Sequence, residues 1–128
     1  MAEKIVLDTN FLLVPGRFKV DIFSELRRVL DSQFELYIPD ICLGELQKLA
    51  SGRGKVGSEA KLGLKLAEKK GVKVMDTGRK GHADDIIVAL AEKERFITAT
   101  QDLSLAKRLK GKGLRVIVLR GKSHLEVV

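Results

Sequence analysis

The hydrophobic residues of this chain form short apolar runs that alternate with stretches of helical period. Five runs are typical of buried strands and cover residues 5–7, 34–38, 72–75, 96–100 and 114–119. Helical stretches lie between them at residues 20–30, 41–50, 58–70, 83–93 and 102–110. Strands separated by helices predict an α/β protein with helices on both faces of a parallel sheet. We expect a three-layer α/β/α sandwich with a central five-stranded parallel sheet, formed by residues 1–128 as a single domain.

Among the segments predicted to be irregular, two are basic. Residues 51–57 contain three glycines together with Arg53 and Lys55, which indicates a flexible basic loop. The residues after Leu119 are predicted to form a short basic tail. No internal repeat, low-complexity tract or domain boundary interrupts the pattern.

The composition is typical of a globular intracellular domain, with 45% hydrophobic and 32% charged residues. The longest apolar run, Ile86 to Ala91, is far shorter than the roughly 20 residues of a membrane span, so no membrane association by a span is expected. The N-terminus lacks the apolar core of a signal peptide. Cys42 is the only cysteine, which excludes an internal disulfide and favours a reducing, cytoplasmic location.

The charge of the chain favours an anionic partner. Lys and Arg number 24 against 17 Asp and Glu, which gives a formal net charge of +7. Such a balance is typical of proteins that bind nucleic acid or a membrane surface, although basic proteins without such a partner are also common. Arg53 and Lys55 are the candidates for nucleic-acid contact, because their glycine-rich segment adjoins the helix that carries Glu45. Lys61, Lys65 and Lys69 recur every fourth residue and fit a solvated outer helix face.

Four acidic residues are candidates for a shared site. Asp8 ends the first predicted strand and Asp102 follows the fourth, and ligands bind at the carboxyl ends of parallel strands. Glu45 lies at the edge of the apolar stripe of its helix, and Asp84 lies on the buried side of the next helix but one. Each acid also has a structural interpretation, because Asp8 and Asp102 suit helix N-caps and Asp84 suits the first turn of a helix.

Taken together, these acids indicate a metal site. Like charges about 4 Å apart repel by roughly 4 kcal/mol at an effective dielectric constant of 20, so a cluster of carboxylates requires a neutralising cation. Oxygen ligands alone select Mg²⁺ or Mn²⁺ over zinc. Such ions suit phosphoryl chemistry. A phosphorylated receiver domain fits less well, because Asp76 after the third strand has no matching lysine after the fifth.

Several stretches of sequence, taken in order, resemble one known family. They are Leu7-Asp8-Thr9-Asn10, the lone Glu45, Asp84-Asp85-Ile86-Ile87 and Thr98-Ala99-Thr100-Gln101-Asp102. Across nearly the whole chain they resemble the PIN-domain ribonucleases, including the 18-residue step from Asp84 to Asp102. Gln101 departs from the family, in which Asn or Arg is commoner.

The resemblance implies a metal-dependent endoribonuclease. The counterparts of Asp8, Glu45, Asp84 and Asp102 form a Mg²⁺ or Mn²⁺ site that cuts single-stranded or structured RNA. The positions of Asn10 and Thr100 support that site by hydrogen bonding, and Asp85 is a candidate auxiliary ligand.

Two branches of the family compete, together with one inactive alternative. VapC-type toxins are similar in size and often dimeric, which implies a homodimer and an antitoxin as partners. Residues 11–15, 18–23 and 118–122 look more like the rRNA-processing endonuclease of the small-subunit processome, which implies ribosomal assembly factors as partners. The alternative is a catalytically inactive PIN-like module that binds RNA.

Overall fold

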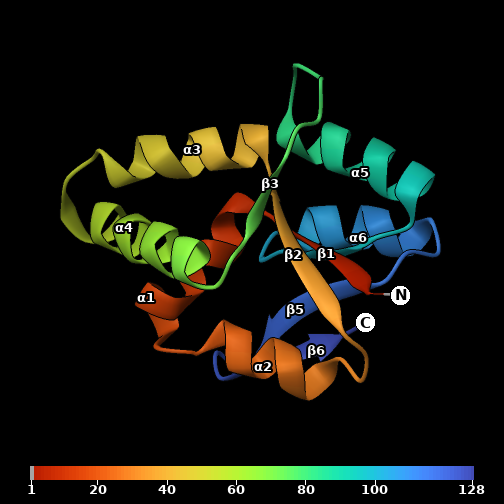
Figure 1. Ribbon diagram of the computed structural model, residues 1–128, viewed down its shortest axis with the longest axis horizontal. Coiled ribbons are helices and arrows are strands. Elements are labelled where there is room, and N and C mark those ends of the chain that lie inside the picture. The colour runs from red at the N-terminus through yellow and green to blue at the C-terminus, as the bar shows by residue number, and fades with distance from the viewer. Residues whose placement is uncertain (1) are drawn as a thin grey trace.

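A six-stranded sheet forms the centre of the molecule in the computed structural model, which describes residues 2–128 (Figure 1). The strand order is β3-β2-β1-β4-β5-β6. The strands are β1 (Glu3–Leu7), β2 (Phe34–Pro39), β3 (Lys73–Met75), β4 (Ile97–Ala99), β5 (Val116–Arg120) and β6 (His124–Val127). Neighbours among β1 to β5 pair in parallel, which confirms the predicted parallel sheet of five strands.

The sixth strand corrects the prediction of an irregular basic tail. β6 pairs antiparallel with β5, with Leu119 opposite Leu125. A tight turn with Gly121 and Lys122 at positive φ joins the two strands. Leu125 is buried while His124 and Glu126 are exposed, which is the alternation of a strand with one buried face. The sequence contained this alternation, although the segment was interpreted from its basic residues.

Within residues 2–128, six α-helices and one short 3₁₀ helix connect the strands. They are η1 (Thr9–Leu13), α1 (Val14–Phe18), α2 (Ile22–Val29), α3 (Asp40–Ala50), α4 (Gly54–Lys69), α5 (Ala83–Glu94) and α6 (Leu103–Gly111). η1 and α1 were not predicted, because their buried residues are consecutive rather than helically spaced. α2 begins at Ile22 because the Asp21 carboxylate accepts hydrogen bonds from the amides of Phe23 and Ser24.

The segment after α3 is much shorter than the flexible loop predicted for residues 51–57. α4 already begins at Gly54, so only residues 51–53 connect the two helices. Gly57 is required for packing rather than flexibility, since a Cβ atom there would collide with the carbonyl oxygen of Gly52. Gly63 is constrained in the same way by the carbonyl oxygen of Leu12. Close backbone contact therefore explains Gly57, which the sequence alone suggested was mobile, and Gly63, which lies within the predicted helix.

The helices form two groups around the sheet. α4 contacts both α1 and α3, and α5 contacts α6, with the α3–α4 pair and the α5–α6 pair on opposite sides of the central strands in Figure 1. β1 is fully buried at Ile5, Val6 and Leu7, as expected for a strand covered on both faces. No helix within residues 2–128 combines the length and apolarity needed to cross a membrane.

Candidate active site

Asp8 lies where the strand order of the sheet reverses. The chain leaves β1 towards β2 on one side, while β4 pairs with β1 on the other side, so the carboxyl end of β1 is a topological switch point. The Asp8 amide donates to the carbonyl of Ala99 at 3.0 Å, which continues the β1–β4 ladder. The Asp8 side chain is buried, with a residue exposure of 4%. An acid buried at this position needs partners, and the neighbouring elements supply them.

Four hydrogen bonds fix the Asp8 carboxylate. Oδ1 accepts from the amide of Thr9 at 2.8 Å and from the thiol of Cys42 at 3.6 Å. Oδ2 accepts from the hydroxyl of Thr100 at 2.8 Å and from the amide Nδ2 of Asn10 at 3.2 Å. The carboxylate is thereby held by η1, α3 and the end of β4 together. The predicted supporting residues Asn10 and Thr100 both contact it directly.

Thr100 also connects Asp8 to Asp102. Its hydroxyl oxygen accepts a hydrogen bond from the Asp102 amide at 3.0 Å while it donates to Asp8. Asp102 is the N-cap of α6, since its Oδ1 accepts from the amides of Ser104 at 2.9 Å and Leu105 at 3.2 Å. The capping interpretation of Asp102 is therefore confirmed, and it leaves the second carboxylate oxygen of Asp102 free for other contacts.

Glu45 approaches the site from α3. Its Oε1 accepts a 2.7 Å hydrogen bond from the hydroxyl of Thr9, and the same hydroxyl lies 3.3 Å from the carbonyl oxygen of Cys42. The Glu45 residue is exposed, whereas Cys42, one helical turn earlier, is fully buried. Glu45 is thus the most accessible of the four predicted acids to solvent and to a ligand.

Asp84 and Asp85 open α5 but face different partners. Asp84 is partly buried and close enough to Asp102 and Asp8 for their charges to interact. Asp85 is exposed and forms a 3.0 Å ion pair with Arg108 of α6. The structure therefore brings Asp84 towards the other acids and engages Asp85 elsewhere.

The electrostatics of the cluster reflect its crowding. Burial raises the pKa of the Asp8 carboxyl, hydrogen bonds from Thr100, Thr9 and Cys42 oppose that rise, and the Glu45 carboxylate adds to it. Burial likewise raises the pKa of Asp84, and the carboxylates of Asp102 and Asp8 raise it further. The carboxylates at this edge of the sheet therefore repel one another, and a bound cation would relieve that repulsion.

The donors fit a hard divalent cation in kind, although their side chains do not form a finished coordination shell. Asp8, Glu45, Asp84 and Asp102 offer oxygen ligands only, as Mg²⁺ and Mn²⁺ prefer. Within residues 2–128, no group of three or more acidic, histidine or cysteine side chains is close enough to hold one ion. Rotation of the exposed Glu45 and partly buried Asp84 side chains would be needed to draw the ligands together.

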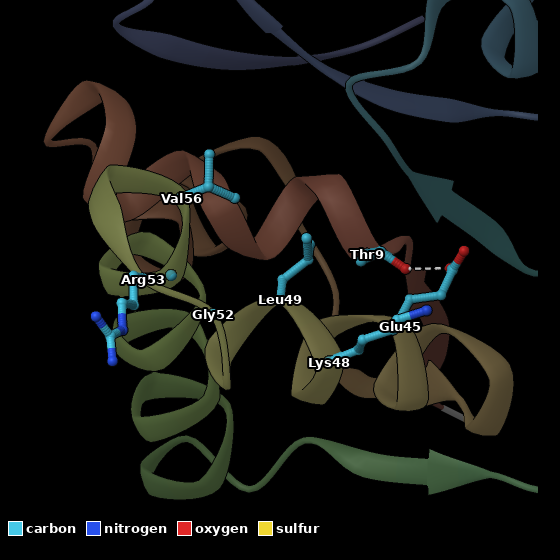
Figure 2. Close-up of a pocket in the computed structure, with 8 residues that line it drawn as sticks. Thr9, Glu45, Lys48, Leu49, Gly52, Arg53 and Val56 are labelled. Atoms are coloured by element: carbon cyan, nitrogen blue, oxygen red, sulfur yellow. Dashed lines mark hydrogen bonds between the residues drawn. The ribbon is translucent and has the colours of Figure 1, made fainter.

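An apolar depression of about 590 Å³ adjoins the acids between α3 and α4 (Figure 2). It is lined by residues from η1, α3, α4 and the α3–α4 connection: Thr9, Glu45, Lys48, Leu49, Gly52, Arg53, Val56 and Gly57. The predicted RNA contact Arg53 is part of this lining, whereas Lys55, in the first turn of α4, is exposed outside it. The two cations that were predicted together therefore have different surroundings.

Four residues near the acids were not identified from the sequence. Thr9 and Cys42 bind the carboxylates directly, and Lys48 and Leu49 line the depression. Helical spacing could have identified three of them, because Cys42, Lys48 and Leu49 lie three or four residues from Glu45 and so share its helix face. Thr9 offered no such signal, because its contact with Glu45 depends on how η1 packs against α3.

The comparisons with known proteins agree with this fold. The chain matches the family of PIN-like domains over residues 5–122, and it therefore belongs to that family. This result confirms the family resemblance and the α/β fold that the sequence indicated.

Relatives from both predicted branches are found. The chain is 35% identical to "Ribonuclease VapC4" of Methanocaldococcus jannaschii, over 97% of this chain and 95% of that protein. It is 30% identical to "rRNA-processing protein FCF1" of Saccharomyces cerevisiae, over 84% of this chain but only 54% of that longer protein. The solved PIN domain endonuclease Utp24 superposes with a TM-score of 0.81 at 24% identity, over 97% of this chain and 90% of that one. This last likeness supports the fold alone.

Proposed function

We propose that this protein is a Mg²⁺- or Mn²⁺-dependent endoribonuclease that hydrolyses RNA phosphodiester bonds. The observation that carries the proposal is the hydrogen-bonded cluster of acids at the sheet's switch point, with Asp8 and Asp102 joined through the Thr100 hydroxyl. Membership of the PIN-like family and 35% identity to a protein named a ribonuclease support it. The four acids Asp8, Glu45, Asp84 and Asp102 would hold the metal.

The residues of the chain would act mainly by positioning. A bound divalent ion supplies charge neutralisation and an activated water for attack on phosphorus. Thr100 and Asn10 keep Asp8 in one orientation, and Thr9 restrains Glu45 at the rim of the depression. Arg53 and Lys48 offer positive charge to the phosphates on the α3–α4 side. The exposed Asp85, held by Arg108, is a candidate auxiliary ligand only if that ion pair opens.

The proposed partner is RNA, single-stranded or structured, in keeping with the net charge of +7. Two biological settings follow from the relatives. Identity to a VapC ribonuclease over nearly the whole length of both chains supports a toxin role, with an antitoxin and a second copy as partners. Identity to an rRNA-processing protein supports a role with ribosomal assembly factors. We place both settings in the cytoplasm.

A cleavage assay on generic single-stranded RNA tests the proposal. We expect cleavage with Mg²⁺ or Mn²⁺ that stops when EDTA is added. Asp8→Asn and Asp84→Asn should each slow cleavage more than the roughly 10–100-fold that loss of a group supporting a metal ligand costs. Asp31→Asn is the matched control, because Asp31 is an exposed acid at the opposite, amino end of β2.

The assay also separates the enzyme from an inactive RNA-binding module. If the purified protein binds RNA but cuts none with either metal, the catalytic proposal is wrong and the binding module is favoured. If both Asp variants cut as fast as the unchanged protein, the activity belongs to another site or to a contaminant.

A further inference from the structure

The depression between α3 and α4 has features of a ligand site that adjoins the acid cluster and shares Glu45 with it. Its volume of about 590 Å³ falls within the roughly 300–1,000 Å³ of small-molecule pockets. Figure 2 shows Leu49 and Val56 between Arg53 at one end and the hydrogen-bonded Thr9–Glu45 pair at the other. Val56 is 42% exposed, so an apolar side chain faces solvent at the middle of this surface.

The lining is suited to an apolar group flanked by negative charges. Leu49 and Val56 offer no hydrogen bond to a phosphate, whereas Lys48 and Arg53 offer positive charge. Gly52 and Gly57 also line the depression, and the missing Cβ atom of Gly57 lets its backbone approach the carbonyl oxygen of Gly52 closely. In an RNA strand, flat bases alternate with phosphates, which matches this order of apolar and cationic groups.

We propose that this depression binds one unpaired nucleobase of the RNA, with the adjoining phosphates held by Lys48 and Arg53. The inference deepens the proposed ribonuclease function and rests on it for the identity of the ligand. Glu45 and Thr9 belong both to the depression and to the surroundings of Asp8, so a strand seated here continues to the acids. A base in a helical duplex is stacked and paired, so the site selects single-stranded RNA next to the cleaved bond.

The base is recognised mainly by its apolar faces. The Thr9 hydroxyl already donates to Glu45, and the central lining consists of aliphatic side chains and glycines. Such a surface distinguishes bases by the apolar area they bury rather than by their hydrogen-bonding edges. We therefore expect all four bases to bind, with purines bound more tightly than pyrimidines.

A double-mutant cycle between protein and RNA tests the inference. The probes are a short single-stranded oligoribonucleotide and a ribose-phosphate chain of the same length without bases, both measured in EDTA so that nothing is cleaved. Val56→Ser should weaken binding of the oligoribonucleotide about fourfold, the effect expected for losing one buried CH₂-sized group. Affinity for the chain without bases should be unchanged, because the phosphate contacts remain.

Val74→Ser is the matched control. Val74 is also an exposed valine, at 54%, but it lies on the edge strand β3 outside the depression. Val74→Ser should change neither the affinity for the oligoribonucleotide nor the affinity for the chain without bases. Val56→Thr, which keeps the branched shape, is the second variant should the serine protein melt at a lower temperature, and it should shift affinity in the same direction.

Several outcomes would contradict the base-binding site and leave the proposed nuclease activity unaffected. One is equal binding of the two probes by the unchanged protein, and another is an equal effect of Val56→Ser on both. Unaltered RNA binding by both Val56 variants would show that no base binds in the depression. Conversely, a positive cycle in a protein that cuts no RNA would support the base site and contradict the nuclease.

Discussion

The hydroxyl of Thr100 donates a 2.8 Å hydrogen bond to Asp8 Oδ2 at the carboxyl ends of two adjacent parallel strands. Both residues are buried, at 0% and 4% exposure, and the same hydroxyl accepts the amide of Asp102. One threonine thus sets the orientation of one acid and the backbone position of another. Because both links pass through a single oxygen atom, they can be removed together by one substitution that keeps the shape of the side chain.

The first prediction concerns that hydroxyl. Thr100→Val should slow metal-dependent RNA cleavage by roughly 10–100-fold, the cost of losing a group that supports a metal ligand. Thr100→Ser retains the hydroxyl and should recover most of the rate. The measurement is single-turnover cleavage at several Mn²⁺ concentrations, and the valine variant should need more Mn²⁺. Equal rates for the two variants would contradict a positioning role for Thr100.

The second prediction separates capping from charge at Asp102. Asp102→Asn keeps the α6 cap, because Asn caps as well as Asp, and it removes a negative charge beside Asp84. We expect its metal-free melting temperature to be unchanged or higher, while Asp102→Ala loses about 1 kcal/mol of stability with the cap. Thermal melts in EDTA and then with Mn²⁺ check this, and Mn²⁺ should stabilise the unchanged protein most. An Asn variant as unstable as the Ala variant would be inconsistent with this division.

The third prediction concerns the edge strand β6. Glu25 accepts hydrogen bonds from Arg28 and from the Leu125 amide, and these bonds lower its pKa from 4.5 to about 2. Stability from a lowered carboxyl pKa is complete above the unfolded value and is lost as pH falls towards the folded value. The stability difference between the unchanged protein and Glu25→Gln should therefore shrink between about pH 5 and pH 2.

Denaturant unfolding at several pH values measures this difference. Glu68→Gln, at an exposed carboxylate of α4, is the control and should show little change with pH. If the Glu25→Gln difference stays constant down to pH 2, the ionised carboxylate does not secure β6.

The fourth prediction concerns a half-buried ion pair between α1 and α4. Glu59 has a side-chain exposure of 5%, and Arg17 contacts its Oε1 at 3.0 Å. Arg17→Met should destabilise the fold by about 2–3 kcal/mol, less than for a fully buried pair because Arg17 is partly solvated. Adding Glu59→Gln should restore part of that loss, since the uncompensated charge disappears. Arg27→Met, at an exposed arginine of α2, is the control and should change stability by no more than about 0.5 kcal/mol. If Arg27→Met destabilises the fold as much as Arg17→Met, the ion pair with Glu59 is not the cause of the loss.

The fifth prediction distinguishes among the cations. Each phosphate contact with a single strand contributes about 0.7 to the slope of log affinity against log salt concentration. Arg53→Ala and Lys48→Ala should each flatten that slope by about one contact, because both residues line the depression beside Glu45. Lys55→Ala, Lys61→Ala and Lys69→Ala should lower affinity only slightly. RNA titrations in an Asp8→Asn background provide the slopes, and equal changes for all five variants would indicate a diffuse basic surface.

Much of the fold was determined by local sequence. Runs such as Ile5-Val6-Leu7 predicted buried parallel strands because a strand covered on both faces carries no polar alternation. Helix starts at Asp21 and Asp102 were encoded by side chains that accept amides two or three residues ahead. The acids at the strand ends were likewise identifiable, because parallel strands bring their carboxyl ends to one edge of a sheet.

The tertiary structure alone decided which of these residues meet. The strand order places Asp8 beside Thr100, and the packing of η1 on α3 places Thr9 against Glu45. β6 and the early start of α4 were also not predicted. β6 depends on its hairpin partner β5, and the start of α4 depends on the close contact between Gly57 and Gly52. Local periodicity records which face of an element is buried. Contacts between residues distant along the chain depend on how those faces are assembled, so they emerge only when the whole sheet and its helices are in place.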